Sequence, residues 1–215
     1  MLADKAAHQQ LIDFFHTGTR LSYKKGESIV RAGDDPRGIY YISEGFVKAY
    51  AITKYGEENI LIVRKDNDIF PMIWAFTGLH RDVTYEAMSD TTLWRVARTE
   101  FLKFLKEHEH AVAAVLDMSV EAYRLHSERV MNLEYRTVRE RIAMFLLSHA
   151  ERFGKKTPTG VLIDAPIKRH DIASSINASR ETTSRELSLL AQKGFVRLDG
   201  GHIEILQSEK LQELL

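Results

Sequence analysis

Residues 167–198 read IKRHDIASSINASRETTSRELSLLAQKGFVRL, and this stretch decides the fold of the C-terminal part of the chain. Apolar residues recur at helical spacing in both of its halves, which predicts two short helices. They are Ile167, Ile172, Ala173 and Ile176 in the first half and Leu187, Leu189, Leu190 and Ala191 in the second. Between them Asn177 tolerates the left-handed backbone that ends a helix, and Ser179 supplies a side-chain oxygen that caps the next one.

The second helix carries side chains that suit DNA reading. Arg180, Glu181, Ser184 and Arg185 fall near its N-terminal end, where a recognition helix meets base edges in the major groove. Arginine donates two parallel hydrogen bonds to guanine, and a carboxylate accepts one from cytosine N4. The alternative is a helical hairpin with a solvated charged face, in which Glu181 only favours the helix N-terminus.

Composition narrows the classes of function. The chain has 215 residues and no cysteine, which excludes disulfides and cysteine-bound metal or iron–sulfur clusters. It contains no run of about 18 apolar residues and no secretion signal, so we expect a cytoplasmic protein without a membrane partner. The length allows one large domain or two modest ones.

Charge is distributed unevenly. The formal net charge is zero, which argues against nucleic acid as a partner for the chain as a whole. Residues 168–197, however, contain six basic and three acidic side chains, which gives this segment a net charge of +3. The basic residues are Lys168, Arg169, Arg180, Arg185, Lys193 and Arg197, and the acidic ones are Asp171, Glu181 and Glu186. This modest footprint suits a protein that binds DNA as two copies.

The sequence pattern of the N-terminal half predicts a β domain. After a helical lead over residues 1–19, turn signals interrupt β-branched and aromatic runs about every ten residues, which is typical of an antiparallel sandwich or barrel. The predicted strands are 28–31, 39–43, 46–52, 58–64, 83–88 and 92–97.

A long helix is predicted over residues 110–133. One apolar row alternates steps of four and three, as in a coiled coil: Val112, Leu116, Ser119, Tyr123, His126, Val130 and Leu133. A second row lies beside it: Ala111, Val115, Met118, Ala122 and Leu125. The helix packs on its own β domain, on a partner chain, or on both. The pattern further predicts a helix over 136–153, a loop over 154–160 and a small hairpin, or wing, closed by 199–201.

The order of these elements resembles the Crp/Fnr family of bacterial transcription regulators. The resemblance spans about residues 20–206 and rests on KKGESIVRAGDDPRGIYYISEGFVKAY (24–50) and SRETTSRELSLLAQKG (179–194). It places Gly26, Gly33 and Gly45 at turns between strands. It implies an α+β protein: an N-terminal antiparallel β jelly-roll barrel (1–109), a long dimerisation helix (110–134) and a C-terminal winged helix-turn-helix domain (135–215).

The resemblance also assigns roles in DNA binding. Arg180, Glu181 and Arg185 match base-reading residues of the catabolite-activator branch, while Glu181, Ser184 and Arg185 match the Glu-x-x-Ser-Arg pattern of the Fnr branch. The implied partners are double-stranded DNA with TGA-like half-sites in an inverted repeat, a second copy bound through 110–133, and RNA polymerase if the protein is an activator. The candidate DNA-binding residues are Lys168, Arg169, Ser179, Arg180, Glu181, Thr182, Ser184 and Arg185.

The expected effector pocket departs from the family pattern. Cyclic-AMP-binding members hold phosphate and ribose with a Gly-Glu pair and an Arg-Ser pair, and here those positions align with Pro71 and Met72 and with Arg81 and Asp82. Proline offers no N–H to an anion, methionine accepts no ribose hydroxyl, and Asp82 adds a negative charge. The sequence therefore argues against cyclic AMP.

What would replace cyclic AMP stays open. The candidate pocket residues are Met72, Trp74, Arg81, His126 and Ser127. An apolar lining suits a planar ligand or a filled core. Two alternatives within the family are a cyclic-nucleotide-responsive regulator and a haem-based sensor with His126 near the iron, although His126 also fits a polar position in the dimer seam.

An enzyme is the alternative from another class. The sequence has no Gly-rich nucleotide loop and no Gly-x-Ser-x-Gly, and His108 and His110, two apart on a helix, do not share a face. We therefore assign no catalytic and no metal-binding residue.

Overall fold

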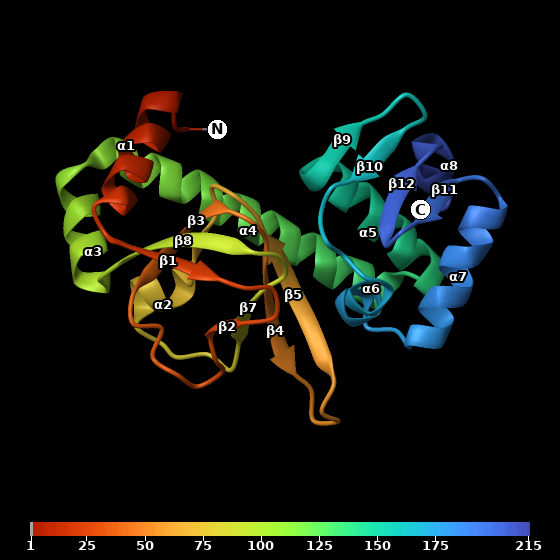
Figure 1. Cartoon of the computed structure of the whole chain (residues 1–215), viewed down its shortest axis with the longest axis horizontal. Coiled ribbons are helices and arrows are strands. Elements are labelled where there is room, and N and C mark those ends of the chain that lie inside the picture. Colours follow the sequence, from red (N-terminus) through yellow and green to blue (C-terminus); the bar gives the residue numbers. More distant parts are fainter. Residues whose placement is uncertain (1) are drawn as a thin grey trace. The chain divides into compact units, whose positions relative to one another are not determined.

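The computed structural model describes residues 2–215 and divides the chain into two units, one ending at His126 and one running from Ser127 to Leu215 (Figure 1). Within the described residues, no helix combines the length and apolar character needed to cross a membrane.

The first unit is built from strands framed by helices. Its elements are α1 (Lys5–His16), β1 (Thr19–Tyr23), β2 (Ser28–Val30), β3 (Ile39–Glu44), β4 (Val47–Ile52), β5 (Glu58–Arg64), β6 (Ile69–Phe70), α2 (Met72–Thr77), β7 (Thr84–Ala87), β8 (Thr91–Val96) and α3 (Arg98–Glu107). The strands pair antiparallel in two four-stranded sheets, of order β1-β8-β3-β6 and β2-β7-β4-β5. The predicted α+β class with an antiparallel β domain is confirmed.

Strand β3 shows why the two sheets close over one core. Its side chains alternate, so that Tyr40 and Ile42 face a cluster between the sheets while Ile39 and Tyr41 face a second cluster under the helices. All four are buried. The second cluster receives Phe15 from α1 and further apolar side chains from α3 and from the long helix α4 (Glu109–Tyr135). Burial of each such side chain contributes about 1.5–3 kcal/mol.

One glycine fixes the turn after β3. Gly45 has φ +99°, a backbone conformation that side chains rarely adopt, and a Cβ there would lie 2.7 Å from the backbone oxygen of Asp90. The glycine therefore lets the β3–β4 turn pass directly over the start of β8.

The structure contains helices and strands that the sequence pattern does not predict. The six predicted strands are present, each end within one residue of its predicted position, whereas the pattern does not predict β1, β6, α2 and α3. β6 has two residues and α2 has six, too few to show a period. Pairing with β8 makes β1 a strand, and pairing with β3 makes β6 a strand, because periodicity does not identify either one.

The long helix is α4 (Glu109–Tyr135), close to the predicted 110–133. Its second apolar row packs on the first unit, since Ala111 and Val115 are buried and Met118 contacts the cluster under the helices. The first row is left exposed. Val112, Leu116 and Val130 are 43%, 46% and 53% exposed.

The second unit is a helical domain with a small sheet. Its elements after α4 are α5 (Val138–Phe153), β9 (Gly154–Lys156), β10 (Val161–Ile163), α6 (Arg169–Ile176), α7 (Arg180–Gln192), β11 (Val196–Asp199), β12 (His202–Ile205) and α8 (Ser208–Gln212). The predicted loop over 154–160 is wrong in its first three residues, which form β9 and pair with β10 in the sheet β11-β12-β10-β9. Two consecutive lysines gave no strand signal, and only the pairing makes this segment a strand.

We expect His149 of α5 to make the second unit less stable in acid. The residue as a whole is half-buried, but its Nε2 is buried with no hydrogen-bond partner within residues 2–215, and its ring stacks on Phe145 at 3.7 Å between centroids. Burial, followed by the charge of Arg152, lowers the pKa of His149 from 6.5 to about 3. Between these two values the unfolded chain binds the extra proton, so stability is full above pH 6.5 and falls as the pH falls.

We expect the free energy of unfolding of this unit to drop by about 2 kcal/mol between pH 7 and pH 5 from this residue alone. Urea unfolding followed at both pH values measures it. His149→Phe keeps an aromatic ring beside Phe145 and removes the titration, so this part of the pH dependence should vanish. An equal drop in both proteins would refute the assignment.

Candidate nucleic-acid interface and effector pocket

The turn between α6 and α7 has the predicted caps. Asn177 adopts the left-handed conformation (φ 52°, ψ 58°), and its N–H donates to the carbonyl of Ala173. Ser179 Oγ accepts a hydrogen bond from Thr182 N at 3.1 Å. Both caps are confirmed, and they fix where the second helix starts.

A buried carboxylate seats the start of α6. Asp171 is 5% exposed, accepts from Lys168 N at 2.8 Å, and lies 3.1 Å from His170 Nε2. Ile172 and Ile176 are buried on the same helix. The candidate residues Lys168 and Arg169 are exposed at its N-terminal end.

Helix α7 separates its two faces cleanly. Thr183, Leu187 and Leu190 are buried, whereas Arg180, Glu181 and Arg185 are exposed and Thr182 and Ser184 are half-buried. Positions four apart share a helix face, which brings Glu181 and Arg185 together. The structure thus gathers the six candidates from Ser179 to Arg185 on the first turns of one helix.

Two residues that sequence reasoning did not single out meet beside this face. Arg139 Nε of α5 lies 2.7 Å from Glu186 Oε2, and Arg185 Nε lies 4.0 Å from the other oxygen of the same carboxylate. Arg139 and Glu186 are 47 residues apart in sequence. No local pattern could have found this pair.

The wing is present as predicted. β11 and β12 pair antiparallel from Val196 with Ile205 to Asp199 with His202. Gly200 and Gly201 both have positive φ, 53° and 87°, as a two-residue turn of type I′ requires.

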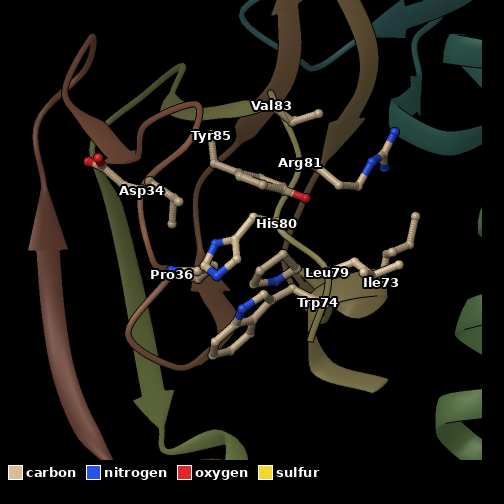
Figure 2. A pocket seen from close by; sticks show the side chains of 11 residues that line it. Asp34, Pro36, Ile73, Trp74, Leu79, His80, Arg81, Val83 and Tyr85 are labelled. Carbon is tan, nitrogen blue, oxygen red and sulfur yellow. The ribbon is translucent and has the colours of Figure 1, made fainter. Parts of the chain in front are cut away.

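A pocket in the first unit lies between the segment 71–85 and the loop after β2. It spans about 330 Å³, a volume that includes space open to solvent. It is lined by Val30, Asp34, Pro36, Pro71, Ile73, Trp74, Leu79, His80, Arg81, Val83 and Tyr85. Figure 2 shows the Tyr85 ring lying across its middle, with the Arg81 guanidinium directed away from the indole of Trp74. Arg98 holds the wall in place, since its Nε donates to the Ala75 carbonyl at 2.9 Å.

The pocket contains two of the five candidate effector residues, Trp74 and Arg81. The other three candidates, Met72, His126 and Ser127, lie outside this lining and stay predictions. Met72 packs into the cluster under the helices, because successive residues of α2 point in different directions, and His126 and Ser127 are exposed on α4.

A small apolar cluster joins Val83, the residue after Asp82, to the middle of α4. Ala49, Ile62 and Val83 are buried together there, and Leu125, next to His126, packs against them. Among the described residues, no group of three or more His, Cys, Asp or Glu side chains could hold a metal ion.

Comparison with known proteins places both halves of the chain. Residues 20–108 match the model of the cyclic nucleotide-binding domain, and residues 140–214 match that of the Crp-like helix-turn-helix domain. The nitrogen fixation regulation protein FixK of Bradyrhizobium diazoefficiens is 23% identical over 95% of this chain and 85% of its own length. The cyclic AMP receptor protein of Thermus thermophilus is 27% identical over 91% of this chain and 87% of its own. The structure of FixK2 from Bradyrhizobium japonicum superposes with a TM-score of 0.80 at 25% identity, over 92% of this chain and 96% of that one.

A cyclic nucleotide-binding-type β domain followed by a Crp-like helix-turn-helix domain defines a DNA-binding transcription regulator, not an enzyme. The chain belongs to the Crp/Fnr family, as the two matches, the relatives and the shared fold show together.

Proposed function

We propose that this regulator acts as a homodimer that binds an inverted repeat of double-stranded DNA through α7. The observation that carries the proposal is the exposed set Arg180, Glu181 and Arg185 on a capped helix whose opposite face is buried. Such a helix enters the major groove with its N-terminal residues toward the base edges.

Each side chain on the reading face has a task. Arg185 contacts a guanine, Glu181 accepts from the cytosine of a neighbouring pair, and Arg180 meets a flanking guanine or a phosphate. Ser179, Thr182 and Ser184 are available for backbone and base contacts, as are Lys168 and Arg169 at the start of α6. By resemblance to both branches of the family, we expect each half-site to contain a TGA-like core.

The exposed row of α4 supports the dimer. Its exposed apolar side chains are separated by four residues and then twice by seven, the length of one heptad. They are Val112, Leu116, Tyr123 and Val130. A contiguous apolar stripe of this kind on a single chain marks an interaction site. We assign residues 1–109 to the sensor domain, 110–134 to the dimerisation helix and 135–215 to the DNA-binding domain. RNA polymerase is the further partner if the protein activates transcription.

Selection from a library of random duplexes tests the proposal. We expect an inverted repeat whose half-site centres lie about one helical turn (~34 Å) apart. Recovery of sequences without twofold symmetry, or of none above background, would refute it.

The effector pocket is diverged from that of cyclic-nucleotide binders. Pro71 and Met72 cannot supply the groups that hold ribose and phosphate, and Met72 is turned into the core. Ile62 and Leu125 pack with Val83, which directly follows Asp82 in the chain. The residues present therefore do not fit a cyclic nucleotide.

Titration calorimetry with cyclic AMP should accordingly detect no binding at micromolar concentrations. The side chains at positions 71, 72 and 82 leave the phosphate charge and the ribose hydroxyls without partners, and an unpaired buried polar group costs about 1–3 kcal/mol. Low-micromolar affinity would promote the second candidate, a cyclic-nucleotide-responsive regulator, which Arg81 in the pocket wall favours. An absorption spectrum of the purified protein tests the haem-based alternative, which the sequence predicts with His126 near the iron. His80 is the histidine that lines this pocket.

A further inference from the structure

One carboxylate lies between two arginines at the edge of the reading face. Glu186 binds Arg139 of α5 through Oε2 at 2.7 Å and approaches Arg185 through Oε1 at 4.0 Å. Its side chain is only 13% exposed, while those of Arg139 and Arg185 are 45% and 69% exposed. The carboxylate thus lies beneath the two guanidinium groups, which face solvent.

The geometry leaves Arg139 with unused donors. Its contact to Glu186 employs Nε, and within residues 2–215 no other hydrogen bond or ion pair involves its side chain. A guanidinium has five N–H donors, so both terminal nitrogens stay available for a planar anion such as phosphate. A second arginine is therefore presented beside the reading helix with its charged end outward.

We propose that Arg139 contacts a DNA phosphate beside the base pair read by Arg185, and that Glu186 is the positioning residue for both arginines. The inference rests on the proposed function in that α7 lies in the major groove. That groove is about 12 Å wide, so a helix seated in it has a phosphate backbone on either side. An arginine that shares a carboxylate with the reading arginine lies within reach of that backbone.

Glu186 lowers the local positive charge, so its contribution must be geometric. A carboxylate near DNA weakens attraction to phosphates. Here it pairs with Arg139 and restricts the Arg185 side chain, and restricting a flexible side chain before binding reduces the entropy lost on binding. Removing Glu186 should therefore leave the affinity for unrelated DNA equal or higher and at the same time reduce discrimination between bases.

The experiment measures binding of the full-length protein to its selected site and to an unrelated duplex over a range of salt concentrations. Arg139→Ala should weaken both complexes by a similar factor, about 3- to 10-fold, and reduce the slope of log K against log salt by about 1. Arg139→Lys keeps the charge and should keep the salt slope while it loses part of the affinity.

Glu186→Gln should give a different result. We expect weaker preference at the base pair of Arg185 and equal or tighter binding to the unrelated duplex. In the Glu186→Gln background, Arg139→Ala should have a smaller effect than in the wild type. Glu151→Gln is the matched control, because it removes the same charge from an exposed position at the far end of α5 and should leave base preference unchanged.

Each outcome tests a separate part of the proposal. If Arg139→Ala weakens only the selected site, or leaves the salt slope unchanged, the phosphate contact is wrong. If Glu186→Gln keeps wild-type base preference, or matches Glu151→Gln throughout, the positioning role is wrong. If Arg185→Ala keeps base preference, the proposed reading role of α7 fails, whereas a uniform loss in Arg139→Ala would still stand as a phosphate contact.

Discussion

Replacing Val112, Leu116 and Val130 with glutamate is expected to convert the protein to monomers and to abolish specific DNA binding. All three side chains are large, apolar and about half exposed on one stripe of α4. In a dimer each glutamate would be buried near its symmetry mate, and burying an unpaired charge costs far more than the apolar contact contributes.

DNA binding is lost with the dimer because two half-sites are read together. Once one reading helix is bound, the second binds intramolecularly at a high effective concentration, and separation of the chains removes this gain of about 10²- to 10⁴-fold. Sedimentation at micromolar concentration reports the oligomeric state, and fluorescence anisotropy with the selected duplex reports binding.

The matched control is Ile52→Glu with Tyr55→Glu, which adds carboxylates at apolar positions of the first unit that are 55% and 78% exposed. This variant should stay dimeric and bind DNA normally. A wild-type protein that sediments as a monomer would contradict the proposed dimer directly.

Arg185→Ala should cost about 1–3 kcal/mol of binding free energy at the selected site and relax the preference at one base pair per half-site. The loss is specific because the guanidinium supplies two hydrogen bonds to guanine that alanine cannot replace. Selection from random duplexes, repeated with the variant, shows which position loses its preference.

Lys168→Ala provides the comparison. Lys168 is exposed at the start of α6, and its backbone N–H is already held by Asp171. If its ammonium meets phosphate, the change should weaken all sequences alike. An Arg185→Ala protein that selects the wild-type sequence would remove the basis for α7 as the reader.

The features predicted correctly from sequence share one physical origin. The left-handed Asn177, the Ser179 cap and the Gly200–Gly201 turn all depend on hydrogen bonds and dihedral angles within a few residues. The buried side of α7 follows from helical periodicity. Such local preferences are encoded in contiguous residues and need no knowledge of the rest of the chain.

The effector pocket shows where that reasoning stops. The resemblance predicts Met72 in the pocket, whereas in the structure Met72 packs against the cluster under the helices and is not part of the lining that contains Trp74 and Arg81. Which side of a six-residue helix faces inward depends on what packs against it, and this is not a property of the helix alone.

The sequence by itself determined the order of the domains, the caps and turns of the DNA-binding module, and the face of α7 that carries its charged side chains. Only the tertiary structure decided which apolar row of α4 is buried, that residues 154–156 form a strand, and that Arg139 meets Glu186. The reason is the range of the interactions: caps and periodicity act over one or two turns, whereas packing and ion pairs join residues that the chain brings together from a distance.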